Sequence, residues 1–283
     1  MKVLVTGTSG QLGHDVAVCP EASGHELLTP SRKEMDLSDV RSAERYLALH
    51  RPDFVIHCAA WTDVDGAETD PEACRKVNVE GTRAIADYCG ENGVPMMYIS
   101  TDYVFNGSGE RPWETDDPTD PVNVYGLSKR DGEDIVGRLP KHYIVRISWV
   151  FGSNGRNFVR TMVNLSAKTD TVCVVADQFG SPTYTADLAP LLWEIAESGK
   201  YGTYHAHNGG YCSWYDVAAE IFRVLGTGTR VIPISSAEYP VKAERPKNSR
   251  LSTDSLVSGG FRALPGWEDA IRRYIEKLTA SSR

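Results

Sequence analysis

The chain has 283 residues, with 30 lysines and arginines against 38 aspartates and glutamates, for a formal charge of −8. At roughly 150 residues per domain, this length suits two domains or one large domain with a lobe, and it buries a core without disulfides or zinc. With 41% hydrophobic and 24% charged residues, the composition excludes a disordered or fibrous chain. The acidic balance argues against a nucleic-acid partner, because phosphate backbones attract basic surfaces.

Membrane and secretion signals are missing from the sequence. No apolar run approaches the roughly 20 residues of a membrane span, and the start, Met1 to Thr6, passes directly into a glycine-rich segment rather than a signal peptide. The six cysteines form no C-x-x-C motif and no pair with zinc-finger spacing. We therefore expect a reduced, cytoplasmic protein without a membrane partner.

Strand and helix patterns alternate through the first half of the chain. We expect strands at 2–6, 25–29, 53–59, 95–100 and 143–148. Between them we expect a helix that runs to Cys19, a helix capped by Ser38, one long helix at 71–89 and another at 125–138. Near-continuous apolar strands separated by helices are typical of βαβ units and a buried parallel sheet.

The alternation becomes irregular after Trp149. Helices are expected at 157–168, 187–197, 213–225 and 267–278, strands at 172–175, 204–208 and 230–234, and a polar loop at 243–253. The fold class is therefore α/β: a doubly wound, Rossmann-like parallel sheet in a dinucleotide-binding domain at 1–150. A smaller mixed α/β lobe, mainly substrate-binding, is expected at 151–283, with some segments returning to the first domain.

A glycine pattern follows the first strand and opens the first helix, which is the context of a dinucleotide-binding turn. Its spacing is G-x-x-G-x-x-G, with Gly7, Gly10 and Gly13. Gly7 permits a tight turn, Gly10 lets a pyrophosphate approach the backbone, and Gly13 allows close packing of helix on strand. The N–H groups at the helix N-terminus favour the same anion.

Three further residues form a candidate catalytic group. Tyr125 and Lys129 are four positions apart, so they share one face of the expected helix. An ammonium near a phenol favours phenolate, so we expect Lys129 to lower the pKa of Tyr125 and make it a general acid. Thr101 ends the fourth strand, at the sheet edge where parallel sheets bind ligands.

These motifs resemble the extended short-chain dehydrogenase/reductase family, in particular its branch that reduces dTDP-4-keto-6-deoxy sugars. The resemblance covers nearly the full length and includes 57–65, 77–82, 146–152, 177–183 and 245–251. The last three segments are specific to the reductase branch. The resemblance implies reduction of the 4-keto group of dTDP-6-deoxy-L-lyxo-4-hexulose by NAD(P)H, giving dTDP-L-rhamnose for polysaccharide biosynthesis.

The resemblance also implies roles for individual residues. Tyr125 would protonate the sugar C4 oxygen, Thr101 would bond the same oxygen, and Lys129 would hold the nicotinamide ribose. The expected cofactor contacts are Gly7, Gly10, Gln11, Leu12 and Gly13 at the pyrophosphate, Asp36 and Leu37 at the adenine, and Ala60, Trp61, Thr62 and Ile99 on the nicotinamide side. The expected substrate contacts are Thr101, Asp102 and Trp149 at the sugar and Arg245 at the nucleotide diphosphate.

Two departures from the family pattern bear on cofactors. Where many members have an acid for the adenine ribose, this chain has Thr29-Pro30-Ser31-Arg32-Lys33, which favours NADPH over NADH because Arg32 can bind a 2′-phosphate. The alternative is that Arg32 and Lys33 are solvated surface charges. Asp15 matches one acidic position of relatives that dimerise through magnesium, so both Mg²⁺ and a homodimer stay open, and no metal ligand is assigned.

Other functions remain as alternatives. One alternative is a different nucleotide-sugar reductase, epimerase or dehydratase of the same family. Another is a regulatory subunit resembling the methionine adenosyltransferase beta subunit. Dehydratases typically carry Asp-Glu after the catalytic threonine, whereas here Asp102-Tyr103 follows Thr101. The presence of Thr101, Tyr125 and Lys129 together favours the enzyme. Trp149 is expected to stack at the site, with a simple core position as its alternative.

Overall fold

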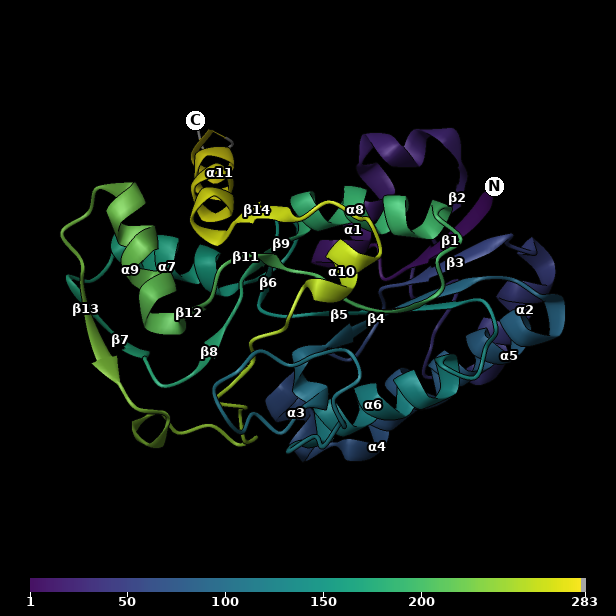
Figure 1. Cartoon of the computed structure of the whole chain (residues 1–283), viewed down its shortest axis with the longest axis horizontal. Coiled ribbons are helices and arrows are strands. Elements are labelled where there is room, and N and C mark those ends of the chain that lie inside the picture. Colours follow the sequence, from purple (N-terminus) through teal and green to yellow (C-terminus); the bar gives the residue numbers. More distant parts are fainter. Residues whose placement is uncertain (281–283) are drawn as a thin grey trace.

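The computed structural model describes residues 1–280 and is built on a six-stranded sheet in the order β10-β5-β4-β3-β1-β2 (Figure 1). All five pairings in it are parallel. The strands are β1 (Lys2–Thr6), β2 (Glu26–Leu28), β3 (Phe54–His57), β4 (Met96–Thr101), β5 (His142–Ile147) and β10 (Gly202–His205). The chain turns back between β1 and β3, so the ends of these strands form the switch point where such sheets bind ligands.

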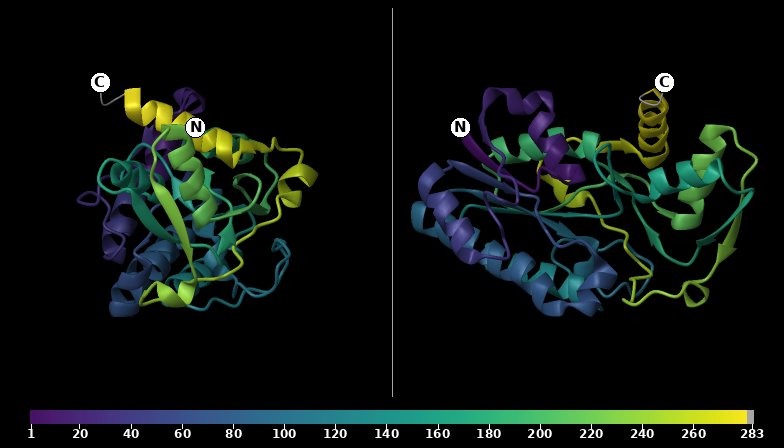
Figure 2. Two further views of the ribbon diagram at one scale, coloured as in Figure 1. Left: turned by 90° about the vertical axis from the view of Figure 1, so that its left-hand side faces the viewer. Right: turned by 180° about the vertical axis from the view of Figure 1, so that it is seen from behind.

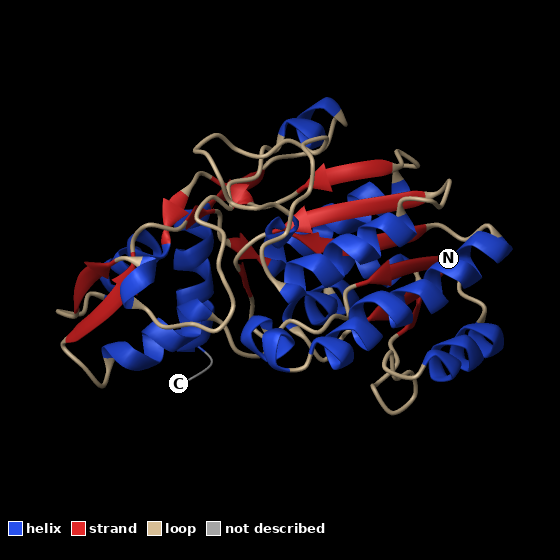
Figure 3. Cartoon of the chain, turned by 90° about the horizontal axis from the view of Figure 1, so that it is seen from below, coloured by secondary structure: helices blue, strands red, loops and turns tan. Residues whose placement is uncertain are grey.

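Helices cover both faces of the sheet, because its strands are apolar on both sides. One face carries α1 (Gln11–Val18) and α8 (Thr185–Glu197), and the other carries α2 (Val40–His50), α5 (Thr82–Asn92) and α6 (Val124–Val136) (Figures 1 and 3). Consecutive strand residues alternate between the layers: Val3 and Val5 face α1 and α8, whereas Leu4 faces α2 and α5. The parallel α/β sheet expected from the sequence is confirmed.

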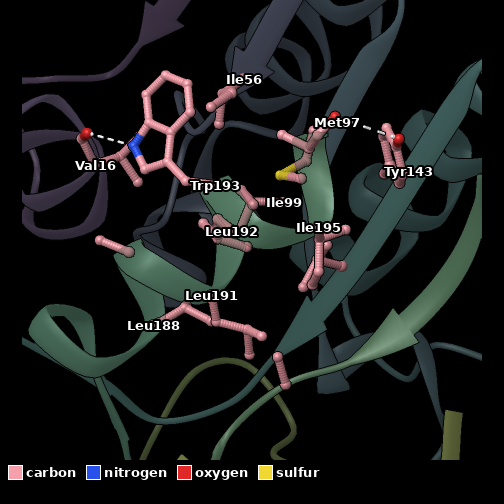
Figure 4. Close-up of a cluster of buried hydrophobic side chains, with 14 of the residues drawn as sticks. Val16, Ile56, Met97, Ile99, Tyr143, Leu188, Leu191, Leu192, Trp193 and Ile195 are labelled. Carbon is pink, nitrogen blue, oxygen red and sulfur yellow. Dashed lines mark hydrogen bonds between the residues drawn. The ribbon is translucent and has the colours of Figure 1, made fainter. Parts of the chain in front are cut away.

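The layer under α8 is densely apolar (Figure 4). Trp193 is 1% exposed and lies among Ile56, Ile99 and Leu192. Its indole N–H donates to the Val16 carbonyl at 3.0 Å and thereby joins α8 to α1. Although α8 and β10 lie beyond residue 150, they belong to the sheet and its helix layer.

A second core forms the lobe at the other end of the molecule (Figure 2). Its main elements are α7 (Phe158–Ser166), α9 (Trp214–Leu225), α11 (Trp267–Ala280) and the parallel pair β7 (Thr171–Val175) and β13 (Arg230–Ile234). Short strands connect it to the sheet: β6 (Val150–Phe151), β8 (Phe179–Gly180), β9 (Thr183–Tyr184), β11 (Asn208–Gly209), β12 (Cys212–Ser213) and β14 (Leu264–Gly266). The division into domains at residue 150 stays a prediction, and the last three residues of the expected lobe lie outside the described residues.

One local expectation was wrong, and another was refined. The helix expected at 71–89 runs without a break from Pro71 to Asn92, as α4 (Pro71–Arg75), a π-helical turn (Lys76–Gly81) and α5. Ser38 does not cap α2; its hydroxyl donates to Asp36 at 2.7 Å, and Asp39 caps the helix by accepting from the Arg41 N–H. The short helices α3 (Val64–Thr69) and α10 (Asp254–Ser258) were not expected. Within residues 1–280, no helix has the length and apolarity to cross a membrane.

Candidate active site

The candidate catalytic residues meet where β4 ends and α6 begins. Thr101 is the last residue of β4, and its hydroxyl accepts from the Tyr103 N–H at 3.2 Å. Asn123 caps α6 by accepting from the Gly126 N–H at 2.8 Å. Gly126 lets the start of α6 lie against the backbone of Tyr103, because a Cβ there would lie only 3.0 Å from the Tyr103 carbonyl carbon. Close packing of these two turns brings Tyr125, the residue before Gly126, to the end of β4.

Tyr125 is held protonated by its surroundings. Burial raises the pKa of its phenol, and a hydrogen bond with Thr101 acts in the opposite direction. From Lys129 we expected a lowered pKa for Tyr125. The net shift is upward, because burial is its largest cause. The ring of Tyr103 lies edge-on to that of Tyr125, with 5.8 Å between centroids. A buried, protonated phenol beside a hydroxyl suits donation of a proton to a developing oxyanion.

Lys129 lies one helical turn after Tyr125 and is 2% exposed. Its Nζ donates to the Ile99 carbonyl at 2.8 Å and lies 3.9 Å from the centroid of the Tyr98 ring. Burial lowers the pKa of Lys129 to about 7, while the charge of Glu133 acts in the opposite direction. Near neutral pH the amine is therefore only partly charged.

Asp102 is a buried carboxyl beside the candidate catalytic threonine. It is 2% exposed, and its Oδ1 accepts from the Thr101 hydroxyl at 2.9 Å. Burial raises its pKa to about 6, and hydrogen bonds from Ser249 and Thr101 oppose this shift. The Thr101 hydroxyl thus lies between two hydrogen-bonded oxygen groups, the Asp102 carboxyl beside it in the chain and the Tyr125 phenol on α6.

The glycine turn has the geometry that its spacing predicts. Gly7 has φ +73°, and a Cβ there would lie 2.7 Å from the Ala59 nitrogen. A Cβ on Gly13 would lie 2.6 Å from the carbonyl carbon of Gly7, so α1 packs against the turn only without a side chain. At Gly10 the nearest atom is the Gly7 carbonyl oxygen at 3.2 Å, which leaves the other side of the backbone accessible. Gln11 and Leu12 follow in the first turn of α1.

A hydrogen-bonded chain joins the ends of β1 and β3 beneath this turn. The His57 ring bonds to the hydroxyl of Thr6 at 2.7 Å and to the hydroxyl of Thr82 at 3.1 Å. The Ala59 N–H donates to Thr6 at 3.1 Å. Burial lowers the pKa of His57 to about 3, so the ring is neutral and acts as one donor and one acceptor.

The segment Ala60–Thr62 follows β3 and is held by Asn78. The Asn78 side chain accepts from the Trp61 N–H at 2.7 Å and donates to the Trp61 carbonyl at 3.1 Å. It also donates to the Ser128 hydroxyl on α6 at 2.9 Å. Asn78 is 1% exposed and lies in the π-helical turn, a distortion that often marks functional positions. It orders the loop expected at the nicotinamide and ties it to the helix that carries Tyr125.

The residues expected at the adenine lie beyond β2. Asp36 accepts from the backbone N–H and the hydroxyl of Ser38, and these bonds hold its pKa below its usual value. Leu37 is buried against Gly81, where a Cβ would lie 2.8 Å from the Leu37 Cβ. Arg32 is 80% exposed, with its Nε 3.4 Å from Asp36.

Two residues expected at the substrate lie in different places, Trp149 toward the lobe and Arg245 against α3. Trp149 adopts φ +48° and stacks on Trp214, with 3.8 Å between ring centroids. Its stacking partner is thus a lobe residue within the same aromatic cluster as Phe158. Arg245 donates to Asp65 at 2.8 Å and to the Ala243 carbonyl at 3.1 Å.

The family assignment follows from comparison with known proteins. The RmlD substrate binding domain family matches residues 1–280. The chain belongs to this family. A dTDP-4-dehydrorhamnose reductase of Streptomyces griseus is 42% identical, over 97% of this chain and 93% of that protein. A dTDP-4-keto-6-deoxy-D-glucose reductase of Streptomyces niveus is 35% identical, over 98% and 97%. The resemblance to the reductase branch is confirmed.

The fold agrees with a solved structure of the same group. The crystal structure of the Bacillus anthracis dTDP-4-dehydrorhamnose reductase in complex with NADP superposes with a TM-score of 0.94 and 36% identity. The superposition covers 98% of this chain and 99% of the crystallised one.

The surroundings of Asp15 do not support the magnesium site that the sequence left open. Asp15 is 6% exposed and hydrogen-bonded to the Thr185 hydroxyl. Among residues 1–280, no three His, Cys, Asp or Glu side chains lie together as a metal site would require. Asp15 therefore joins α1 to α8 within the fold.

Sequence reasoning missed several residues that shape the site of this RmlD-family chain. The Thr6–His57–Thr82 connection joins three elements and has no local signature. Asn154 was also missed: it donates to the carbonyls of Ser9 and Gly10 at 2.9 and 3.2 Å, so the segment after β6 contacts the glycine turn. A polar residue in a loop is a common feature, and only its long-range partner shows its role.

Proposed function

We propose that this chain is an NAD(P)H-dependent reductase of the 4-keto group of dTDP-6-deoxy-L-lyxo-4-hexulose, with dTDP-L-rhamnose as product. The observation that carries the proposal is the convergence of Thr101, Tyr125 and Lys129 at the end of β4, which only β3 separates from β1 and its glycine turn. The names of the family members, including two keto-sugar reductases, support the same chemistry.

The glycine turn fits a dinucleotide. It lacks side chains at Gly7, Gly10 and Gly13, two of which admit no Cβ, and it opens α1, a helix N-terminus that favours an anion. Gln11 and Leu12 would contact the pyrophosphate, Asp36 and Leu37 the adenine side. Ala60, Trp61, Thr62 and Ile99 would face the nicotinamide, and Lys129 its ribose. The bound dinucleotide supplies the hydride.

Residues of the chain itself would protonate and hydrogen-bond the carbonyl oxygen. The Tyr125 phenol is protonated at neutral pH, and burial raises its pKa further, so it has a proton to donate as the oxygen gains charge. The Thr101 hydroxyl bonds the same oxygen, and a donor placed where charge develops stabilises the transition state. Asp102 and Trp149 would contact the sugar, and Arg245 the diphosphate.

NADPH is the proposed cofactor, with NADH as the alternative. Arg32 is exposed beyond β2, where the chain has no carboxylate at 29–33, so its guanidinium is available to a 2′-phosphate. A cytoplasmic location and a homodimer remain predictions.

A second candidate is reduction of a related dTDP-keto sugar. The relative named dTDP-4-keto-6-deoxy-D-glucose reductase is nearly as similar as the rhamnose-pathway one, and the two substrates differ in stereochemistry rather than in the reacting group. The same catalytic group would serve both, so the sugar has to be decided by assay.

The test is reduction of the keto sugar, followed as loss of reduced nicotinamide. The parent protein should turn over, and Tyr125→Phe should lower kcat by roughly 10²–10⁴ at matched cofactor saturation. Tyr88→Phe makes the same change on α5 and should retain the parent rate. Comparable rates for parent and Tyr125→Phe would refute the mechanism, and an inactive parent that binds its ligands would favour the regulatory subunit.

A further inference from the structure

Three segments that are distant in sequence meet beside Tyr125: helix α3, the N-terminus of α6 and the loop 242–245. Asp65 on α3 makes most of the contacts to the loop. Its Oδ1 accepts from the backbone N–H groups of Lys242 and Ala243 at 3.1 and 2.9 Å, and its Oδ2 accepts from the Arg245 guanidinium at 2.8 Å. One carboxylate thus holds both the backbone of the loop and the side chain expected at the substrate diphosphate.

The same loop is tied to the catalytic helix from its other side. Asn123, which caps α6 through its Oδ1, donates from Nδ2 to the Glu244 carbonyl at 2.8 Å. Glu68, one turn after Asp65 on α3, accepts from the Val124 N–H at 2.8 Å. Asn123 and Val124 immediately precede Tyr125, so the position of the loop is coupled to the start of the catalytic helix.

The guanidinium of Arg245 is well placed for an anion near the reacting group. Its side chain is 17% exposed, and it bonds to Asp65 and to the Ala243 carbonyl. Two of its five N–H donors are engaged in these contacts, and the other three have no hydrogen-bond partner within residues 1–280. The charges of Asp102, Arg245, Tyr125 and Asp65 all affect the pKa of Tyr103, which burial raises. Asp65 is on the helix whose Glu68 accepts from the Val124 N–H, so the pair lies near Tyr125.

We propose that Asp65 is a positioning residue that orients Arg245 and the loop 242–245 for the diphosphate of the nucleotide-sugar substrate. This inference rests on the proposed function. Two hydrogen bonds hold the guanidinium in one orientation before the substrate arrives, so less side-chain entropy is lost on binding. A diphosphate carries more than one negative charge, so it is attracted to the remaining donors although Asp65 partly offsets the charge of Arg245. Asp65 itself touches neither the sugar nor the dinucleotide.

The experiment measures binding of dTDP alone by calorimetry, together with steady-state kinetics. Asp65→Asn keeps the shape of the side chain but removes the charged bond to Arg245. It should weaken dTDP binding and raise KM for the keto sugar by about tenfold each, the effect of losing one charge-assisted hydrogen bond. The kcat should change less than about threefold, and NADPH affinity should stay at the parent value, which a general loss of structure would not spare.

Matched variants distinguish positioning from general damage. Asp70→Asn makes the same carboxyl-to-amide change at the N-cap of α4, where Asn caps equally well, and should leave dTDP binding at the parent value. Asp65→Glu retains the charge and should recover part of the affinity. Asn123→Asp keeps the cap of α6 but loses the donor to Glu244, so it should weaken dTDP binding as well.

Two outcomes would overturn the proposal. If Asp65→Asn binds dTDP as tightly as Asp70→Asn, Asp65 does not position Arg245. Tighter binding by Asp65→Asn would show that the carboxylate competes with the diphosphate. The proposed function fails separately: a parent protein that does not reduce the keto sugar refutes it, whereas an active parent with unchanged dTDP binding in Asp65→Asn refutes only the positioning role.

Discussion

Glu133 and Arg146 form a two-pronged ion pair between α6 and β5, with Nε–Oε1 and Nη2–Oε2 distances of 2.9 and 2.7 Å. Each side chain is 7% exposed. Because Glu133 is one turn beyond Lys129, the pair fixes the helix that carries Tyr125 to β5, the neighbour of β4 in the sheet.

The first prediction follows from the burial of this pair. Glu133→Gln leaves a buried guanidinium without its counter-ion, so the free energy of unfolding should fall by about 3–5 kcal/mol in urea titrations. The matched change Glu220→Gln removes the partner of the exposed Arg223 and should lower it by less than about 1 kcal/mol. Equal effects of the two changes would contradict a structural role for the buried pair.

The second prediction concerns pH. The folded pKa of Lys129, about 7, lies below its unfolded value of 10.5, mainly because of burial. Between these values the unfolded chain binds more protons, so stability conferred at this position rises with pH. Relative to Lys129→Met, the parent should gain up to ~1.4 kcal/mol per pH unit between pH 7 and 9 in urea unfolding. A difference that stays constant across this range would show that the amine keeps its ordinary pKa.

The third prediction tests the glycine turn. A methyl group on Gly13 would overlap the Gly7 carbonyl, so Gly13→Ala should push α1 away from the turn and lower the free energy of unfolding by about 1–3 kcal/mol. NADPH binding, measured by fluorescence, should weaken with it. Gly24→Ala is the control, because a Cβ there meets no atom within 4 Å. Its unfolding free energy and NADPH affinity should stay near the parent values, and a similar loss in both variants would argue against the overlap.

The fourth prediction concerns cofactor choice. If Arg32 contacts a 2′-phosphate, Arg32→Ala should weaken NADPH binding by about 1.5–3 kcal/mol and barely change NADH binding. Arg45 is also well exposed, at 72%, and lies on α2, so Arg45→Ala should alter neither affinity. Equal losses for both cofactors in Arg32→Ala, or none, would leave Arg32 as a surface charge.

Residue types and spacing within short segments were enough to predict the parallel sheet, the glycine turn and the helix that begins at Tyr125. The capping pattern was wrong at Ser38, which bonds to Asp36 instead of capping α2. The helix expected at 71–89 formed, but no pattern showed its π-helical turn at Asn78, whose amide binds Trp61.

The sequence by itself determined which segments form strands and helices along the chain, and which residue types stand at the end of each strand. The reason is that periodicity and turn chemistry act over a few residues. Only the tertiary structure decided their partners and protonation. Asp65 and Arg245 are 180 positions apart, and Glu133 pairs with a residue on another element. The pKa of Tyr125 is set by burial, which depends on what packs around it. Long-range contact and desolvation arise only when the chain has folded, so no local pattern specifies them.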